Sequence, residues 1–263
     1  MPSGTPDESE ELGTLRVIAT AGARRAGEVL LERFGAAPRD VRAKSSPQDL
    51  VSAADLAAER ALRTHLEAAR PGDGVLGEEG GETPSHTGLR WVLDPLDGTW
   101  NFLHGIPHWC VSVACERGSE GLVGVVYDPL RDECFTAARG CGATLGDVVL
   151  DGPAEVGLDG ATLGAEFSAR TEQDAAAARR LVLALGMTRV YGAGALDMAW
   201  LAAGRLHAVY NTRYPSRWDL AAGGVLCGEV GVEIRRAGTD AAPRLLAAAP
   251  PLLSRLLAVL AEG

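Results

Sequence analysis

The sequence has no long apolar run, no paired-cysteine motif and no internal repeat. No run reaches the roughly 18 apolar residues that a membrane-spanning helix needs, and no apolar segment follows a basic start. The five cysteines contain no C-x-x-C pair, a pattern more typical of reduced thiols than of a disulfide framework. No period of about 20–50 residues recurs, which excludes a solenoid. These absences predict a cytoplasmic protein without a membrane partner.

Basic residues are scarce relative to acidic ones. Lys and Arg number 25 against 35 Asp and Glu, and the resulting net charge of -10 argues against nucleic acid as a partner. An anionic substrate is still compatible with this charge, because bound metal ions reverse the sign of the local potential. The 263 residues are 46% apolar, so they can bury a sizeable core as one large domain or two packed lobes.

Residues 91–99, W-V-L-D-P-L-D-G-T, join an apolar strand to two carboxylates. Asp94 and Asp97 follow the apolar run, and Pro95 between them cannot continue a central ladder, so the strand is expected to stop there. Carboxylate oxygens are ligands that Mg2+ prefers. For each aspartate taken alone, turn capping is the alternative, because Asp-Pro and Asp-Gly are common turn dipeptides.

A helix is expected to start directly after this strand. Gly98 allows close backbone approach, and Thr99 is a good N-cap for the residues that follow. The N-terminus of a helix favours phosphate. Carboxylates beside a helix start therefore predict a phosphate that is bound through a metal ion.

The motif D-P-L-D-G-T at 94–99, followed by N-F at 101–102 and H-G-I-P at 104–107, resembles the inositol monophosphatase family of Mg-dependent, lithium-sensitive phosphatases. A second motif, W-D-L-A-A-G at 218–223, is also similar to that family. The resemblance covers about residues 12–262. It implies hydrolysis of a phosphorylated small molecule by metal-activated water, and a homodimer.

The resemblance implies metal ligation by four acidic side chains and one carbonyl. Of two or three Mg2+ ions, the first is expected on Glu78, Asp94 and the Leu96 carbonyl. The second is expected on Asp94, Asp97 and Asp219. Taken alone, Glu78 beside a glycine fits a solvated turn, and Asp219 fits a charge that the helix dipole stabilises.

The resemblance also implies catalytic roles for Glu78 and Thr99, which would orient the attacking water. Asp55 is expected behind them, accepting a hydrogen bond from the Thr99 hydroxyl; a helix-start charge is its alternative interpretation. The amides of Gly98 and Thr99 are expected to bind phosphate oxygens. The same segment of the family supplies a basic loop residue, which is Lys44 in this chain.

A glycine-rich turn, Gly192, Ala193 and Gly194, precedes a helix and allows close backbone approach to a ligand, although ordinary packing explains such a turn equally well. The resemblance favours substrate contact, with Ala193 where the family commonly has Ser or Thr. Thr212 stands where many members have a glutamate that binds a sugar hydroxyl. With Arg213 beside it, this suits a more anionic or differently shaped substrate than inositol phosphate. The complete set of expected substrate contacts is Asp97, Gly98, Thr99, Gly192, Ala193, Gly194, Arg213 and Asp219.

The resemblance implies an activity like that of inositol-1-monophosphatase. Histidinol-phosphate, fructose 1,6-bisphosphate and 3'-phosphonucleotide hydrolysis on the same fold are the alternatives within enzymes. The alternative from another class is a regulatory binding module that retains the metal site.

The fold implied is an α/β layered sandwich of the order αβαβα. It has a larger antiparallel sheet with two helices, a smaller mixed sheet sandwiched by helices, and the site between the two lobes. We expect a disordered tail at 1–11, an N-terminal lobe at 12–150 and a C-terminal lobe at 151–263, within a single family domain at 12–262. The first helix is expected from Leu12 to Phe34.

Overall fold

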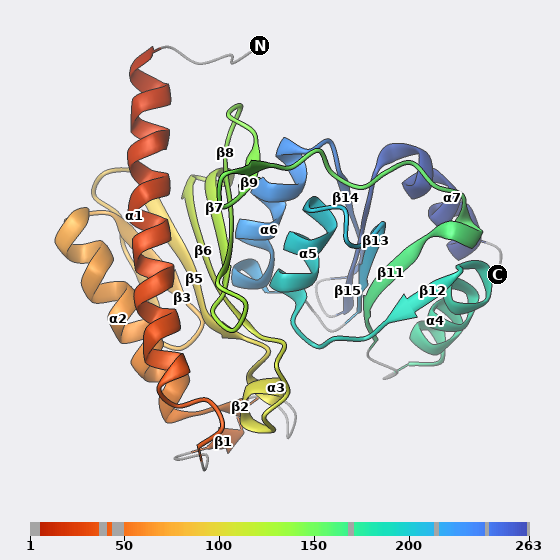
Figure 1. Ribbon diagram of the computed structural model, residues 1–263, viewed down its shortest axis with the longest axis horizontal. Coiled ribbons are helices and arrows are strands. Elements are labelled where there is room, and N and C mark those ends of the chain that lie inside the picture. The colour runs from red at the N-terminus through yellow and green to blue at the C-terminus, as the bar shows by residue number, and fades with distance from the viewer. Residues whose placement is uncertain are drawn as a thin grey trace.

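The computed structural model of the chain describes residues 6–36, 41–43, 50–167, 171–212, 216–239 and 242–261. Its elements form five layers, in the order helices, sheet, helices, sheet, helices (Figure 1). This is the layered α/β sandwich that the sequence predicts. The helices are α1 (Pro6–Leu31), α2 (Ala53–Ala69), α3 (Thr99–Leu103), α4 (Glu172–Ala184), α5 (Gly194–Ala202), α6 (Arg217–Glu229) and α7 (Pro250–Ala261), with a 3-10 turn η1 (Leu158–Gly160).

The larger sheet has eight strands in the order β10-β9-β8-β7-β6-β5-β3-β4. All neighbours are antiparallel except β3 and β5, which run parallel, so the sheet is mixed by this one pair. The pair matters because its two carboxyl ends lie at the same edge of the sheet. The strands are β3 (Gly74–Gly77), β4 (Gly81–Thr83), β5 (Leu89–Asp97), β6 (Cys110–Arg117), β7 (Glu120–Asp128), β8 (Glu133–Ala138), β9 (Ala143–Leu145) and β10 (Val148–Val149).

The smaller sheet is mixed, as predicted, with the order β12-β11-β13-β15-β14. β11 pairs in parallel with β12 and β13, and the remaining pairs are antiparallel. Three short or alanine-rich strands, β4, β12 and β15, lack the β-branched alternation that marks a strand in a sequence. The strands are β11 (Thr162–Glu166), β12 (Met187–Arg189), β13 (Ala208–Asn211), β14 (Glu233–Thr239) and β15 (Ala242–Ala248); β1 (Arg42–Ala43) and β2 (Leu50–Val51) form a separate pair.

Three apolar clusters fill the spaces between the layers. One lies between α1, α2 and the larger sheet and includes Leu15, Leu62 and Trp91. The second lies around α5 and α6 between the sheets, and the third joins the smaller sheet to α4 and α7. In the described ranges, no helix combines the length and the apolar character that crossing a bilayer requires.

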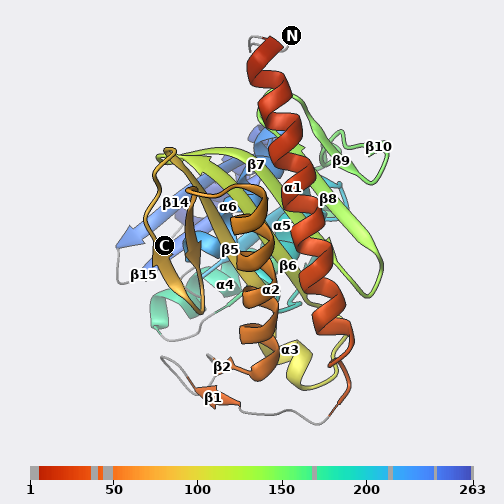
Figure 2. The same ribbon diagram turned by 90° about the vertical axis from the view of Figure 1, so that its left-hand side faces the viewer.

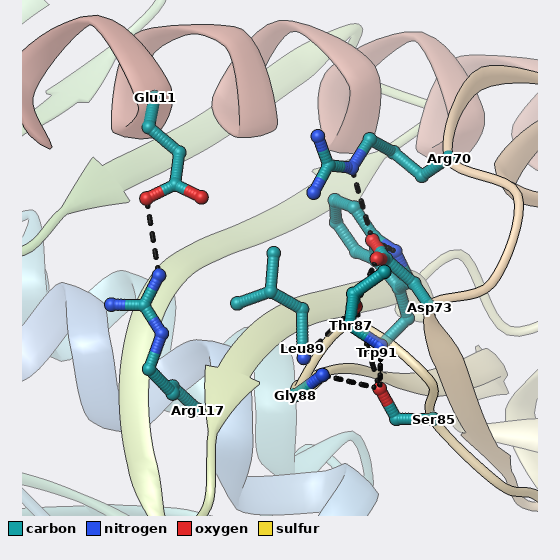
Figure 3. Close-up of polar contacts among 9 residues, drawn as sticks. All are labelled: Glu11, Arg70, Asp73, Ser85, Thr87, Gly88, Leu89, Trp91 and Arg117. Atoms are coloured by element: carbon teal, nitrogen blue, oxygen red, sulfur yellow. Dashed lines mark hydrogen bonds and ion pairs between the residues drawn. The ribbon is translucent and has the colours of Figure 1, made fainter. Parts of the chain in front are cut away.

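The first helix begins earlier than expected. The sequence predicted a disordered tail at 1–11. Residues 1–5 lie outside the described residues, but α1 starts at Pro6 and extends past the end of α2 (Figure 2). Acidic residues in its first turns pair with arginines at the larger sheet. Glu8 Oε1 lies 2.6 Å from Nη2 of Arg139, in the turn after β8. Glu11 Oε2 lies 3.1 Å from Nη2 of Arg117, at the end of β6 (Figure 3). These pairs and the helix dipole stabilise the polar residues as helix.

Candidate functional site

A β-bulge in β5 brings Asp94 and Asp97 to one face. Asp94 pairs with Ser112 and Asp97 with Cys110, so three steps along β5 match two along β6. Residues three apart in a regular strand point to opposite faces, and one extra residue restores the same face. The expectation that β5 stops at Pro95 was wrong, because the bulge accommodates a proline without a ladder hydrogen bond.

The helix after β5 starts with Gly98, not with Thr99, as its N-cap. Gly98 has φ +87°, and a Cβ there would lie 3.0 Å from the His108 carbonyl oxygen, so only glycine fits this turn. Thr99 is the first helical residue, and its hydroxyl does not cap the helix. That hydroxyl lies 3.0 Å from Asp55 Oδ1, as predicted, and 3.0 Å from the Leu96 carbonyl oxygen.

Glu78 lies beside Asp94 because β3 and β5 are parallel and in register. Gly77 pairs with Leu93, and the Glu78 N–H donates to the Leu93 carbonyl at 3.2 Å. The two carboxyl groups share a hydrogen bond. The turn after β3 and the strand β5 therefore present Glu78 and Asp94 at the same edge of the larger sheet.

Asp97 reaches the N-terminus of α5. Its Oδ2 accepts hydrogen bonds from the backbone N–H groups of Ala195 at 2.7 Å and Leu196 at 3.4 Å. Burial, and then the negative charge of Glu166, raise the pKa of Asp97 to about 8, although the two amides act in the opposite direction. Asp97 thus links the larger sheet to the helices between the sheets.

Asp219 comes from α6 and joins the same group. Its Oδ2 accepts the Ser216 N–H at 2.5 Å, a contact that fits the alternative interpretation of Asp219 as a helix-start charge. Burial first, then the charges of Asp97 and Glu78, raise the pKa of Asp219 well above its usual range. The residue therefore both caps its helix and belongs to the acidic group.

Asp94 is the centre of this acidic cluster, which consists of Glu78, Asp94, Asp97 and Asp219. Burial raises the pKa of Asp94 well above its usual range, and the negative charges of the other three members raise it further. Among the described residues, the main causes that raise the pKa values of Asp94 and Asp219 are burial and the negative charges of neighbouring carboxylates. Buried carboxylates of this kind are costly without a positive partner, so the donor set fits a hard divalent cation.

The cluster is not a closed coordination shell. In the described ranges, no three His, Cys, Asp or Glu side chains are arranged so that they could hold a metal ion. One oxygen of each aspartate accepts a backbone N–H instead; for Asp94 this is Leu96 N–H at 3.0 Å. Ligation by these side chains therefore stays a prediction, and it requires the side chains to rearrange.

The turn at residues 192–194 lies against α3. The Asn101 amide donates to the carbonyls of His108 and Tyr191, each at 2.7 Å, and Gly192 has φ +83°. Ala193 has no exposed surface, so direct contact between Ala193 and a substrate is the part of the prediction that the structure does not support. Asn101 belongs to the motif after D-P-L-D-G-T, but the sequence alone predicts no role for it.

The end of β13 differs from expectation in its neighbours. Thr212 is buried, and its N–H donates to the Glu166 carbonyl at 2.9 Å. Arg213 and Lys44, which were expected near the substrate, lie outside the described residues. Glu166 was missed, yet its charge raises the pKa values of Asp97 and Asp219. Only the pairing of β11 with β13 brings it there, and no local motif signals that pairing.

Comparisons with known proteins point to one family. The sequence profile of the inositol monophosphatase family matches residues 11–262. An inositol-1-monophosphatase of Rhizobium meliloti is 41% identical over 212 residues, 79% of each chain. A protein of Xylella fastidiosa named Nus factor SuhB is 40% identical over 218 residues, 81% of this chain and 78% of its own. The crystal structure of extragenic suppressor protein suhB from Bartonella henselae has a TM-score of 0.88 at 30% identity, covering 95% of this chain and 99% of that one.

Proposed function

Because the chain belongs to the inositol monophosphatase family, we propose that it hydrolyses phosphate monoesters of sugars or polyols with the help of Mg2+ ions. The observation that carries this proposal is the acidic cluster: the buried Asp94 meets the half-buried Glu78, Asp97 and Asp219, which come from the turn after β3, from β5 and from α6. Such a group binds a divalent cation and, through it, a phosphate.

Glu78, Asp94, Asp97, Asp219 and the Leu96 carbonyl would hold the ions. When bound, Mg2+ supplies Lewis-acid polarisation of the phosphate and neutralises charge on the attacking and leaving oxygens. The chain's own residues orient the reactants. Glu78 and the Thr99 hydroxyl, which Asp55 holds at 3.0 Å, would direct a water toward phosphorus. The amides of Gly98 and Thr99 would bind phosphate oxygens.

The substrate is the finer part of the proposal. A panel of phosphomonoesters, with released phosphate measured at fixed Mg2+, tests it: inositol 1-phosphate, histidinol phosphate, fructose 1,6-bisphosphate and a 3'-phosphonucleotide. We expect turnover of inositol 1-phosphate or another polyol phosphate. Greater turnover of histidinol phosphate or the 3'-phosphonucleotide would reassign the substrate class.

Homodimer formation, cytoplasmic location and lithium inhibition belong to the same proposal. A Li+ titration at fixed Mg2+ tests the last of these, and turnover that is unaffected by Li+ would remove it.

A relative named Nus factor SuhB favours one second candidate, a binding module that retains the metal site. This candidate gains support if no tested monoester releases phosphate while Mg2+ still binds. Mg2+-dependent turnover favours the enzyme.

A further inference from the structure

Helix α2 carries a polar stripe on the face that contacts the ends of β3 and β5. Asp55, Glu59 and Arg63 are four residues apart, so they lie on one face of the helix. Asp55 holds Thr99, as described above. Glu59 is the member of the stripe that neither the sequence motifs nor the proposed mechanism uses.

The Glu59 carboxylate binds the turn that follows Glu78. Its Oε2 accepts the Glu79 N–H at 2.8 Å, and its Oε1 accepts the Gly80 N–H at 2.8 Å. Glu59 is only 3% exposed. Because the Glu78 N–H is itself bonded to β5, the backbone is fixed at Glu78 and at both following residues.

Arg63 completes this arrangement from the other side. Its Nε donates to Glu59 Oε1 at 2.7 Å, which balances the buried charge. Its Nη2 donates to the Gly81 carbonyl at 2.6 Å, and its Nη1 donates to Thr83 Oγ1 at 3.0 Å. The arginine thus ties Glu59 to β4, and the turn between β3 and β4 is held at both of its ends.

The two glycines that flank the glutamate pair admit Glu59. A Cβ at Gly80 would lie 2.5 Å from Glu59 Oε1, and a Cβ at Gly77 would overlap the same atom. No side-chain-bearing residue fits at either position while Glu59 stays in place. The spacing G-E-E-G is therefore explained by a side chain that lies about twenty residues earlier in the sequence.

We propose that Glu59 is a positioning residue for Glu78, acting through the backbone of residues 78–80. The inference rests on the proposed function, because it assumes that Glu78 serves a metal-dependent site. Without the carboxylate, the N–H groups of Glu79 and Gly80 lose their acceptors, and the turn relaxes. Glu78 then moves away from Asp94, and the affinity of the cluster for Mg2+ falls.

The test compares E59Q with D73N. Glutamine keeps the volume of Glu59 but presents an N–H2 group toward backbone donors. Asp73 is a matched control: its side chain is 1% exposed, it accepts hydrogen bonds from Arg70 and Trp91, and it lies at the other end of β3 and β5 (Figure 3). Two measurements are made on each protein: Mg2+-dependent phosphate release, and the rise in Tm on adding MgCl2.

We expect E59Q to raise the Mg2+ concentration for half-maximal turnover by about 10–100-fold, as loss of a group behind a metal ligand does. Its Mg2+-induced rise in Tm should shrink accordingly. D73N should lose Tm without Mg2+ but keep the wild-type response to it. If E59Q is not obtained folded, E59D replaces it. The shorter carboxylate reaches one of the two amides, and its Mg2+ requirement should lie between wild type and the value expected for E59Q.

Equal Mg2+ responses in wild type, E59Q and D73N would overturn the inference and leave Glu59 as a brace for the turn only. The same holds if E59D has the wild-type Mg2+ requirement. If wild type releases no phosphate from any tested monoester, the proposed function fails. The Tm response to Mg2+ then still decides whether Glu59 positions the cluster.

Discussion

Two threonine–aspartate hydrogen bonds bracket strand β5, and they differ in charge balance. Before the strand, the Thr87 hydroxyl donates to Asp73 Oδ1 at 2.6 Å, just beyond the end of α2 (Figure 3). After the strand, the Thr99 hydroxyl donates to Asp55 Oδ1 at 3.0 Å, at the start of α2. A threonine–aspartate hydrogen bond therefore links each end of α2 to one end of β5.

The surroundings of the two aspartates are opposite in sign. Arg70 Nε lies 3.1 Å from Asp73 Oδ2, so that carboxylate is neutralised. Asp55 accepts from Ser52, a neutral partner, at 2.9 Å and 2.6 Å, and burial raises its pKa. Among the described residues, an arginine therefore neutralises the aspartate before β5, whereas the hydrogen-bond partners of Asp55 after β5 are neutral. Because a buried charge without a cationic partner is costly, we expect an external cation at the end of β5 that holds Asp55 and the acidic cluster.

The largest effect that would test this contrast comes from removing one charge at each end. D94N or D219N should lower Mg2+-dependent phosphate release by about a thousandfold, because metal ligands supply several kcal/mol to the transition state. Neither variant should lower Tm in chelator, since burial and the neighbouring carboxylates already disfavour the charged form of both side chains. D73N should do the reverse and lose about 1–3 kcal/mol of stability while it keeps its turnover. Undiminished turnover in D94N and D219N would break the contrast.

A smaller effect separates the two threonines. T99V replaces the hydroxyl with a methyl group, so the side chain keeps nearly the same volume. It should lower kcat by about 10–100-fold, with the helix cap at Ser52 intact. T87V removes the equivalent bond at the other end and should cost about 1 kcal/mol of stability, with kcat unchanged. Steady-state kinetics and urea unfolding of both variants measure the two effects. Equal kcat values in T99V and T87V would show that the Thr99 hydroxyl plays no part in turnover.

The sequence predicts contacts between recognised motifs better than it predicts contacts between other segments that lie far apart in the chain. The Asp55–Thr99 bond was expected because the motifs around both residues resemble those of the family, and the structure contains this bond. The sequence does not predict the bulge, because Pro95 signals only that a regular ladder is impossible. Asp97 accepts from Ala195, which is 98 residues away, and no spacing rule reveals a partner at that distance. The sequence does not predict the role of Glu59 either, because its partners are the backbone N–H groups of Glu79 and Gly80. A backbone N–H requires no particular residue type, so no sequence motif indicates the contact.

The smallest effect concerns pH and sharpens the charge contrast without mutation. The pKa of Asp97 is raised from 3.8 to about 8, chiefly by burial and then by Glu166, so the folded state favours the protonated carboxyl. In chelator, this contribution to stability is fully present below pH 3.8 and is lost as pH rises through about 8. Mg2+ competes with the proton, so its stabilising effect should be larger at pH 9 than at pH 6, reaching about 2.7 kcal/mol when Mg2+ is a hundredfold above its Kd. Urea unfolding at both pH values, with MgCl2 or chelator, measures the difference.

Two variants serve as controls for this pH effect. D73N should show the same increase, because residue 73 lies at the other end of β3 and β5 from the acidic cluster. D97N should lose the increase. An Mg2+ effect that is equal at the two pH values in wild type would mean that the protonated carboxyls and the cation do not share a site.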